Sequence, residues 1–112
     1  MMRYKNYYGS VHYSDEDKAF YGKVEFIRAL VSYEGTDIKS LRKSFEEAID
    51  DYLQTCKEQG KEPEQPFKGS FNIRVGSRLH QHIALEATKR GVTLNKYIVD
   101  VLEKETAKQK TA

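Results

Sequence analysis

The feature that most constrains this chain is a six-residue stretch, residues 70–75, in which polar and apolar residues alternate. Successive side chains of a β-strand point to opposite faces, so this alternation separates the two kinds of residue completely. The apolar face would hold Phe71, Ile73 and Val75, and the polar face Ser70, Asn72 and Arg74. The stretch is therefore predicted to be a strand with one face in a core and one face in water.

Two amphipathic helices are predicted directly after this strand. The first starts at Gly76-Ser77 and ends at Gly91, and the second can be capped by Thr93. The apolar face of the first helix carries Leu79, Ile83, Ala84 and Ala87, and that of the second carries Leu94, Tyr97, Ile98, Val101 and Leu102. The spacing thus predicts a strand-helix-helix unit.

A unit this small cannot cover the apolar side of a lone strand, and such domains usually need a metal, disulfides or oligomerisation. His80 and His82 do not share a helix face, and the single cysteine, Cys56, cannot form an internal disulfide. We therefore expect a homodimer in which strand 70–75 pairs antiparallel with its copy; whether dimers pair into tetramers is left open. The expected dimer core is Phe71, Ile73, Val75, Ile83, Leu94 and Ile98.

The polar face of the paired strands suits the reading of base edges in DNA. The major groove admits a two-stranded ribbon, Asn can bond adenine at two points and Arg can do so to guanine. The N-terminus of the last helix offers backbone N–H groups to a phosphate, and two-fold symmetry predicts a palindromic operator. The expected DNA-binding residues are Ser70, Asn72, Arg74, Thr93, Leu94, Asn95 and Lys96.

Charge and composition agree with this division of the chain. The net charge of +2 is unevenly distributed, because residues 1–60 are acidic overall and residues 61–112 are basic. A basic C-terminal half favours a polyanionic partner. The sequence contains neither a membrane-length apolar run nor a secretory h-region, and Cys56 falls on an apolar helix stripe, so we expect a cytoplasmic protein.

The N-terminal half is predicted to be three antiparallel strands followed by a helix. Aromatic and β-branched residues favour strands over residues 7–13, 19–26 and 29–33, with a bulge or close backbone approach at Gly22. Thr36 or Asp37 can cap the helix and Gly60 can end it. Its apolar stripe is Ile38, Leu41, Phe45, Ala48, Ile49, Tyr52, Leu53 and Cys56.

The whole chain is therefore expected to be an α+β protein with two domains. Residues 1–60 form a β-β-β-α domain, and residues 70–112 form the dimerising β-α-α domain. Between them, residues 61–69 contain both prolines and no apolar periodicity, which indicates a semi-rigid linker.

The order of motifs resembles two known families. The run Phe71-Asn72-Ile73-Arg74, followed by two helices around Gly91, resembles the ribbon-helix-helix (MetJ/Arc-type) repressors. The chain from about Tyr7 to Leu102 resembles the HicB antitoxin family. The motifs that carry this second resemblance are residues 21–24, 31–35 and 45–53 and the joint from Gly60 to Arg74.

The HicB resemblance implies a function with two surfaces. It implies a partial ribonuclease-H-like N-terminal domain that masks a HicA-type toxin, an mRNA-cleaving enzyme. It also implies a C-terminal domain that represses the operon from which both proteins are made. The protein would then be the antitoxin of a type II toxin–antitoxin system, with operator DNA, the toxin and its own copy as partners and no cofactor.

Three alternatives remain open from the sequence. The chain could be a stand-alone ribbon-helix-helix regulator without a toxin, or a module that binds only proteins. The acids that could suggest a two-metal nuclease are Asp15, Asp17, Glu25, Asp50 and Asp51. An enzyme is disfavoured, because Asp15 and Asp17 fall in a turn, and Asp50 and Asp51 diverge by about 100° on a helix. No metal site and no catalytic residue is therefore expected.

Overall fold

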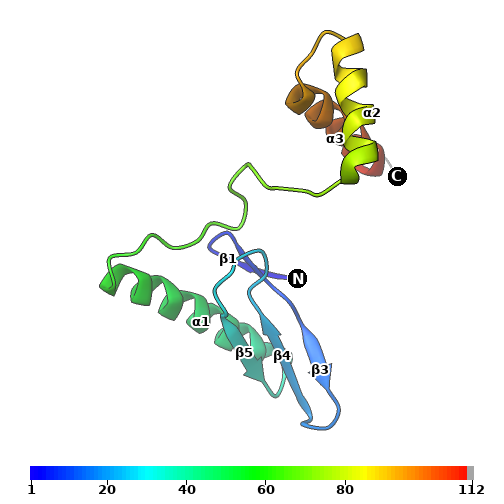
Figure 1. The fold of residues 1–112 in the computed structure, drawn as a ribbon. Coiled ribbons are helices and arrows are strands. Elements are labelled where there is room, and N and C mark those ends of the chain that lie inside the picture. The colour runs from blue at the N-terminus through cyan, green and yellow to red at the C-terminus, as the bar shows by residue number, and fades with distance from the viewer. Residues whose placement is uncertain (111–112) are drawn as a thin grey trace. The chain divides into compact units, whose positions relative to one another are not determined.

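The computed structural model describes residues 1–110 and shows an α+β chain with two compact units, Met1–Phe71 and a second that begins at Asn72 (Figure 1). The strands are β1 (Met2–Tyr4), β2 (Tyr7–Gly9), β3 (His12–Ser14), β4 (Ala19–Lys23) and β5 (Ser32–Gly35). The helices are α1 (Ile38–Glu58), α2 (Gly76–Lys89) and α3 (Leu94–Lys110). Within the described residues, none of the helices has the length and apolar content needed to cross a bilayer.

The first unit contains an antiparallel three-stranded sheet in the order β3-β4-β5 and a separate hairpin, β1-β2. The predicted strand over residues 7–13 is divided into β2 and β3 at Ser10 and Val11. At this interruption the chain stays beside β4 in one antiparallel register, because Gly9 pairs with Val24 just as His12 pairs with Tyr21. Ser10 N–H donates to the Lys23 carbonyl at 3.0 Å, and a Cβ on Gly22 would lie 2.0 Å from the Ser10 carbonyl oxygen. The close backbone approach expected at Gly22 is therefore confirmed.

The last strand of the sheet starts later than the sequence pattern predicts. Residues 29–33 were the expected strand, whereas β5 spans Ser32–Gly35 and residues 25–30 form a loop. Val24 N–H donates to the Val31 carbonyl at 2.9 Å and closes this loop. Phe26 within it has a φ of +66°, a backbone conformation that is unfavourable for a bulky residue. Local amino-acid composition alone could not predict this loop over residues 25–30.

The hairpin β1-β2 is an element that the sequence pattern did not predict. Lys5 and Asn6 form its two-residue turn with φ values of 49° and 71°, as expected for the turn that suits strand twist. Tyr4 and Lys5 both reach Asp50 on α1, at 3.0 and 2.8 Å. Hydrogen bonding by Lys5 and Tyr4 holds the pKa of Asp50 below its usual value. These contacts attach the hairpin to α1.

Helix α1 begins and ends where the sequence predicts. The Asp37 carboxylate accepts a hydrogen bond from Ser40 N–H at 2.7 Å, and the Ser40 hydroxyl contacts Asp37 N–H at 3.1 Å, which completes a capping box. After the helix, Gly60 adopts a φ of +65° and Lys61 N–H donates to the Cys56 carbonyl. These local signals therefore define both ends of α1.

The core of the first unit lies between α1 and the strands. Leu41, Phe45 and Ile49 are fully buried on the inner face of α1, and Cys56 is buried as expected. Tyr33 packs edge-on against Phe45, and its hydroxyl donates to the Ser10 carbonyl at 2.7 Å. Burial raises the pKa of Tyr33 to about 12. The core thus depends on strands and helix together.

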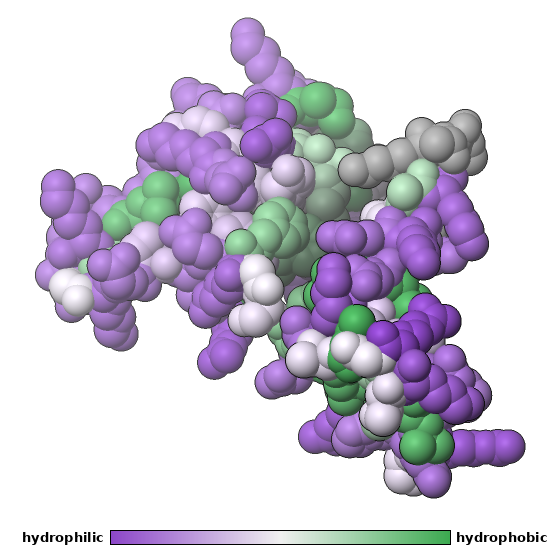
Figure 2. Space-filling model, turned by 90° about the horizontal axis from the view of Figure 1, so that it is seen from above, coloured by the Kyte–Doolittle hydropathy of each residue, from purple (hydrophilic) through white to green (hydrophobic). Residues whose placement is uncertain are grey.

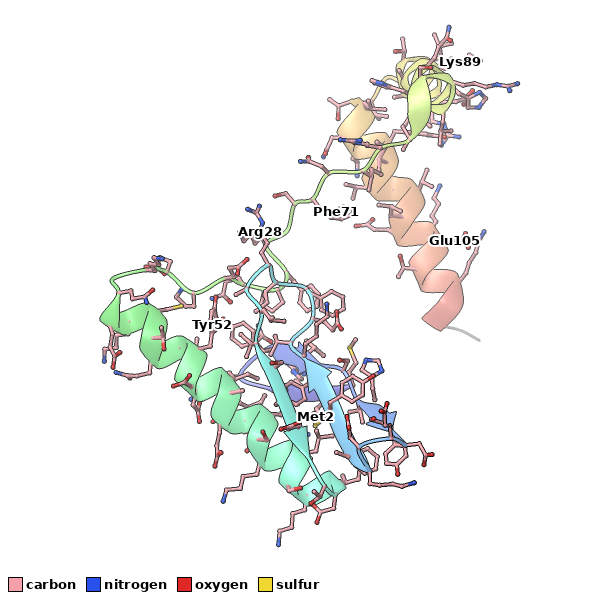
Figure 3. All side chains as sticks on the ribbon, turned by 60° about the horizontal axis from the view of Figure 1, so that its bottom comes forward. Met2, Arg28, Tyr52, Phe71, Lys89 and Glu105 are labelled. Atoms are coloured by element: carbon pink, nitrogen blue, oxygen red, sulfur yellow. The ribbon has the colours of Figure 1, made fainter. Side chains whose placement is uncertain are left out.

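The segment predicted to be a linker is held on the first unit by Glu64. Its carboxylate accepts hydrogen bonds from Arg28 N–H and Ala29 N–H at 2.9 and 2.8 Å, which lower the pKa of Glu64. Its own N–H donates to the Tyr52 hydroxyl, and its carbonyl accepts from the Tyr7 hydroxyl at 2.7 Å. Tyr52 and Arg28 are labelled in Figure 3. We call these contacts the Glu64 clasp.

Candidate nucleic-acid and dimer interface

Residues 70–75 form no strand in the single chain; residues 70–74 run as an extended segment (Figure 3), whereas Val75 has helical backbone angles, φ −106° and ψ −8°, at the start of α2. A strand requires a hydrogen-bonded neighbour, and the described chain places none beside this segment. Phe71 lies on this segment in Figure 3 and is 75% exposed, and Ile73 is 58% exposed, whereas Val75 is half-buried. The apolar face predicted by the alternation is therefore present but uncovered.

The polar residues of the same segment are accessible to a partner. Ser70, Asn72 and Arg74 are all exposed, and no side-chain hydrogen bond or ion pair involves them within the described residues. Their donors and acceptors therefore remain available for a partner.

An apolar cavity of about 170 Å³ lies between the extended segment and the helices of the second unit. Four of the six expected dimer-core residues line it, and the remaining two, Phe71 and Leu94, do not. The lining consists of Ile73, Val75, Ile83, Tyr97, Ile98, Val101 and Leu102. The structure thus gathers most of the predicted core on one open apolar surface.

The second unit has almost no core of its own. Ala87 is its one buried apolar residue among those described, whereas large residues including Leu79, Leu85 and Leu102 are about half exposed. Apolar residues appear as green areas at the surface in Figure 2. Because burial of apolar surface drives folding, this unit lacks the interior that would stabilise it alone.

The N-terminus of α3 carries the second predicted DNA contact. The Thr93 hydroxyl accepts a hydrogen bond from Lys96 N–H at 3.0 Å, which confirms Thr93 as the cap. The first-turn N–H groups of Leu94 and Asn95 have no intrahelical acceptor by the geometry of an α-helix. Lys96 pairs with Asp100 at 2.9 Å, and this hydrogen bond raises the pKa of the lysine. Lys96 therefore remains charged but is partly neutralised by its neighbour.

The acids of the first unit are dispersed over its surface. Asp15 pairs with Lys18 at 2.9 Å, and Asp50 pairs with Lys5. Among the residues that the structure describes, no three His, Cys, Asp or Glu side chains are placed to hold one metal ion.

Sequence comparison adds one finding to this geometry. The HicB family model matches residues 52–102, a range that begins in α1, contains Glu64 and the extended segment, and ends in α3. No curated protein and no solved structure matches the chain. This range is slightly less than half of the chain, and over it the sequence is similar to the HicB family.

Proposed function

We propose that this protein is an antitoxin that masks a HicA-type mRNA-cleaving toxin and represses its own operon as a dimer. The family match supports the first part of the proposal. The second part is supported by the exposed apolar side chains of residues 70–75, because a second copy of the chain would cover them. HicB proteins are generally antitoxins and not enzymes, and we propose the same for this chain.

The proposed dimer pairs residues 70–75 antiparallel with the same segment of a second copy. Such pairing satisfies the open backbone groups of the segment and covers Phe71 and Ile73, which are exposed in the single chain. It also places the two apolar cavities against each other, so that one core forms from both copies. Residues 70–74 are extended and unpaired in one chain, which is the state from which such a ribbon would form, whereas Val75 would have to leave its helical backbone conformation to join it.

The polar face of the ribbon would then enter the major groove. Asn72 and Arg74 would read base edges, and each bidentate contact would contribute about 1–3 kcal/mol of discrimination. Ser70 would discriminate less because a hydroxyl can donate or accept. The free N–H groups of Leu94 and Asn95, with Thr93 and Lys96 beside them, would hold a phosphate and set the register.

An electrophoretic mobility shift on the DNA upstream of the gene tests the repressor role. Arg74→Ala should relax the preference for one base at one position in each half-site. Lys96→Ala should weaken binding to all sequences and reduce the slope of log K against log salt concentration by about 1. Lys89→Ala is the matched control, because Lys89 is also an exposed lysine paired with a carboxylate on its own helix. Equal, purely salt-dependent losses for Arg74→Ala and Lys96→Ala would remove support for base reading.

Co-purification with a catalytically inactive HicA-type toxin tests the masking role separately. A stable complex that protects RNA from the active toxin would support it. DNA binding without any complex would instead favour a stand-alone regulator, and complex formation without DNA binding would favour a module that binds only proteins.

A further inference from the structure

Strand β5 is an edge of the three-stranded sheet, and its outer side is unoccupied in the described chain. Val24 N–H donates to the Val31 carbonyl, and in an antiparallel ladder every second residue directs its backbone N–H and C=O groups to the neighbouring strand. Along β5, the residues at even spacing from Val31 therefore face β4. By this alternation Tyr33 faces β4, whereas the N–H and C=O groups of Ser32 and Glu34 point to the open side. β5 therefore presents backbone donors and acceptors to a partner strand.

Strand β5 and one flank of α1 lie side by side in Figure 1, and two open depressions adjoin this edge. The depressions have volumes of about 340 and 540 Å³, meet at Ser32 and together extend along residues 30–34; the larger one also reaches Tyr21 and Gly22 of β4. We call them together the groove. The helix residues that line them are Ser44, Ala48, Asp51, Tyr52 and Thr55. Three of these five side chains, those of Ser44, Ala48 and Thr55, are small, and a neighbouring strand would lie about 4.8 Å from β5.

The opposite flank of α1 is in contact with the β1-β2 hairpin, where Asp50 is bound by Tyr4 and Lys5. Asp51, one residue later, faces the groove and has no ion pair within the described residues. The open edge is therefore the flank of α1 that the chain itself leaves uncovered.

The charge of the groove defines the kind of segment that it fits. Glu34 and Asp51 are its two charged lining residues, both acidic, and neither has an ion pair among the described residues. Leu30 is 80% exposed at one end of the groove and offers an apolar contact. An extended segment with basic side chains and one apolar side chain matches these features.

We propose that β5 pairs with an extended, basic segment of the toxin, which adds a fourth strand to the sheet beside α1. This inference rests on the proposed function, in which the partner cleaves mRNA; an enzyme that binds a polyanion is expected to carry basic side chains. A second copy of this chain is a poorer occupant, because pairing of β5 with itself would bring acidic side chains such as Glu34 together without counter-charges. Backbone pairing would supply affinity, and Glu34 and Asp51 would select basic side chains.

Amide hydrogen exchange of the full chain, with and without a catalytically inactive HicA-type toxin, tests the pairing directly. The amides of Ser32 and Glu34 should exchange at least about tenfold more slowly in the complex, because each gains a hydrogen-bond acceptor. The Tyr33 amide is an internal control, since it already faces β4 and should change much less. The Tyr13 amide on β3, the other edge strand, should not change.

Two substitutions separate backbone pairing from charge. Glu34→Gln retains the N–H group and should weaken toxin binding only slightly, with a smaller salt dependence. Glu34→Pro also removes the outward N–H group, which an edge strand tolerates, and should weaken binding at least about tenfold more than Glu34→Gln. Retained exchange protection of the Tyr33 amide would show that each variant is folded.

The outcomes distinguish this inference from the proposed function. A toxin complex in which Ser32 and Glu34 exchange as in the free chain would overturn the β5 pairing and leave the antitoxin role intact. The absence of any complex would overturn both. Protection of these two amides in the chain alone that increases with its concentration would assign the edge to a second copy and overturn the proposal.

Discussion

Replacement of Glu64 by alanine should destabilise the first unit although the residue lies in a segment without secondary structure. The substitution removes two hydrogen bonds from the carboxylate to Arg28 N–H and Ala29 N–H, at 2.9 and 2.8 Å, and leaves the backbone bonds of residue 64 in place. A hydrogen bond to a charged group contributes about 1.5–3 kcal/mol when buried. Because water can reach this loop and replace part of the lost bonding, we expect a total loss of about 1–2 kcal/mol.

The effect should depend on pH in a defined direction. The two N–H groups hold the folded-state pKa of Glu64 below the ordinary value of 4.5. A group with a lowered folded-state pKa stabilises the fold fully above its unfolded-state pKa and loses this contribution as the pH falls through the lower value. The difference in unfolding free energy between wild type and Glu64→Ala should therefore be full at pH 7 and decrease progressively below pH 4.5.

Urea unfolding followed by circular dichroism measures this free energy, and hydrogen exchange locates its cause. The Arg28 and Ala29 amides should lose protection in Glu64→Ala. Glu62→Ala is the matched control, because Glu62 is an exposed glutamate of the same segment without a bonding partner among the described residues. Equal destabilisation by both substitutions, or a loss for Glu64→Ala that persists unchanged at pH 3, would refute the role of the clasp.

Three further substitutions test the core, the close backbone approach at Gly22 and the dimer. Phe45→Ala should cost about 3–5 kcal/mol of unfolding free energy in urea, since Phe45 is fully buried; a loss below about 1 kcal/mol would contradict this core. Gly22→Ala should lower the melting temperature sharply, because the new Cβ would lie 2.0 Å from the Ser10 carbonyl oxygen, and an unchanged melting curve would disprove this close backbone approach. Ile73→Asp should yield a monomer in analytical ultracentrifugation where wild type is a dimer, and dimers of both proteins would exclude the 70–75 ribbon.

The predictions that succeeded concern local interactions. Helix α1 was predictable because its apolar residues recur at helical spacing and because Asp37 and Gly60 act on backbone groups within a few residues. The Thr93 cap and the position of α2 and α3 were predictable for the same reason. In each case the sequence contains both partners of the interaction within one helical turn.

The predictions that failed concern pairing over a longer range. The strand expected over residues 7–13 does keep one register beside β4 from Gly9 to Ser14, but its regular strand structure is interrupted at Ser10 and Val11, where the backbone closely approaches Gly22. The β1-β2 hairpin was missed because a Lys-Asn turn is a weaker signal than Asn-Gly. Glu64 was assigned to a linker because its binding partners, at Arg28 and Ala29, are more than thirty residues away in the chain.

The sequence by itself determined the helices, their caps and the alternation of polar and apolar residues over 70–75, because these depend on side-chain periodicity and on neighbouring backbone groups. Only the tertiary structure decided the strand register, the clasp at Glu64 and the open edge of β5. These features arise from hydrogen bonds between distant segments, whose partners are selected by the packing of the whole unit against α1.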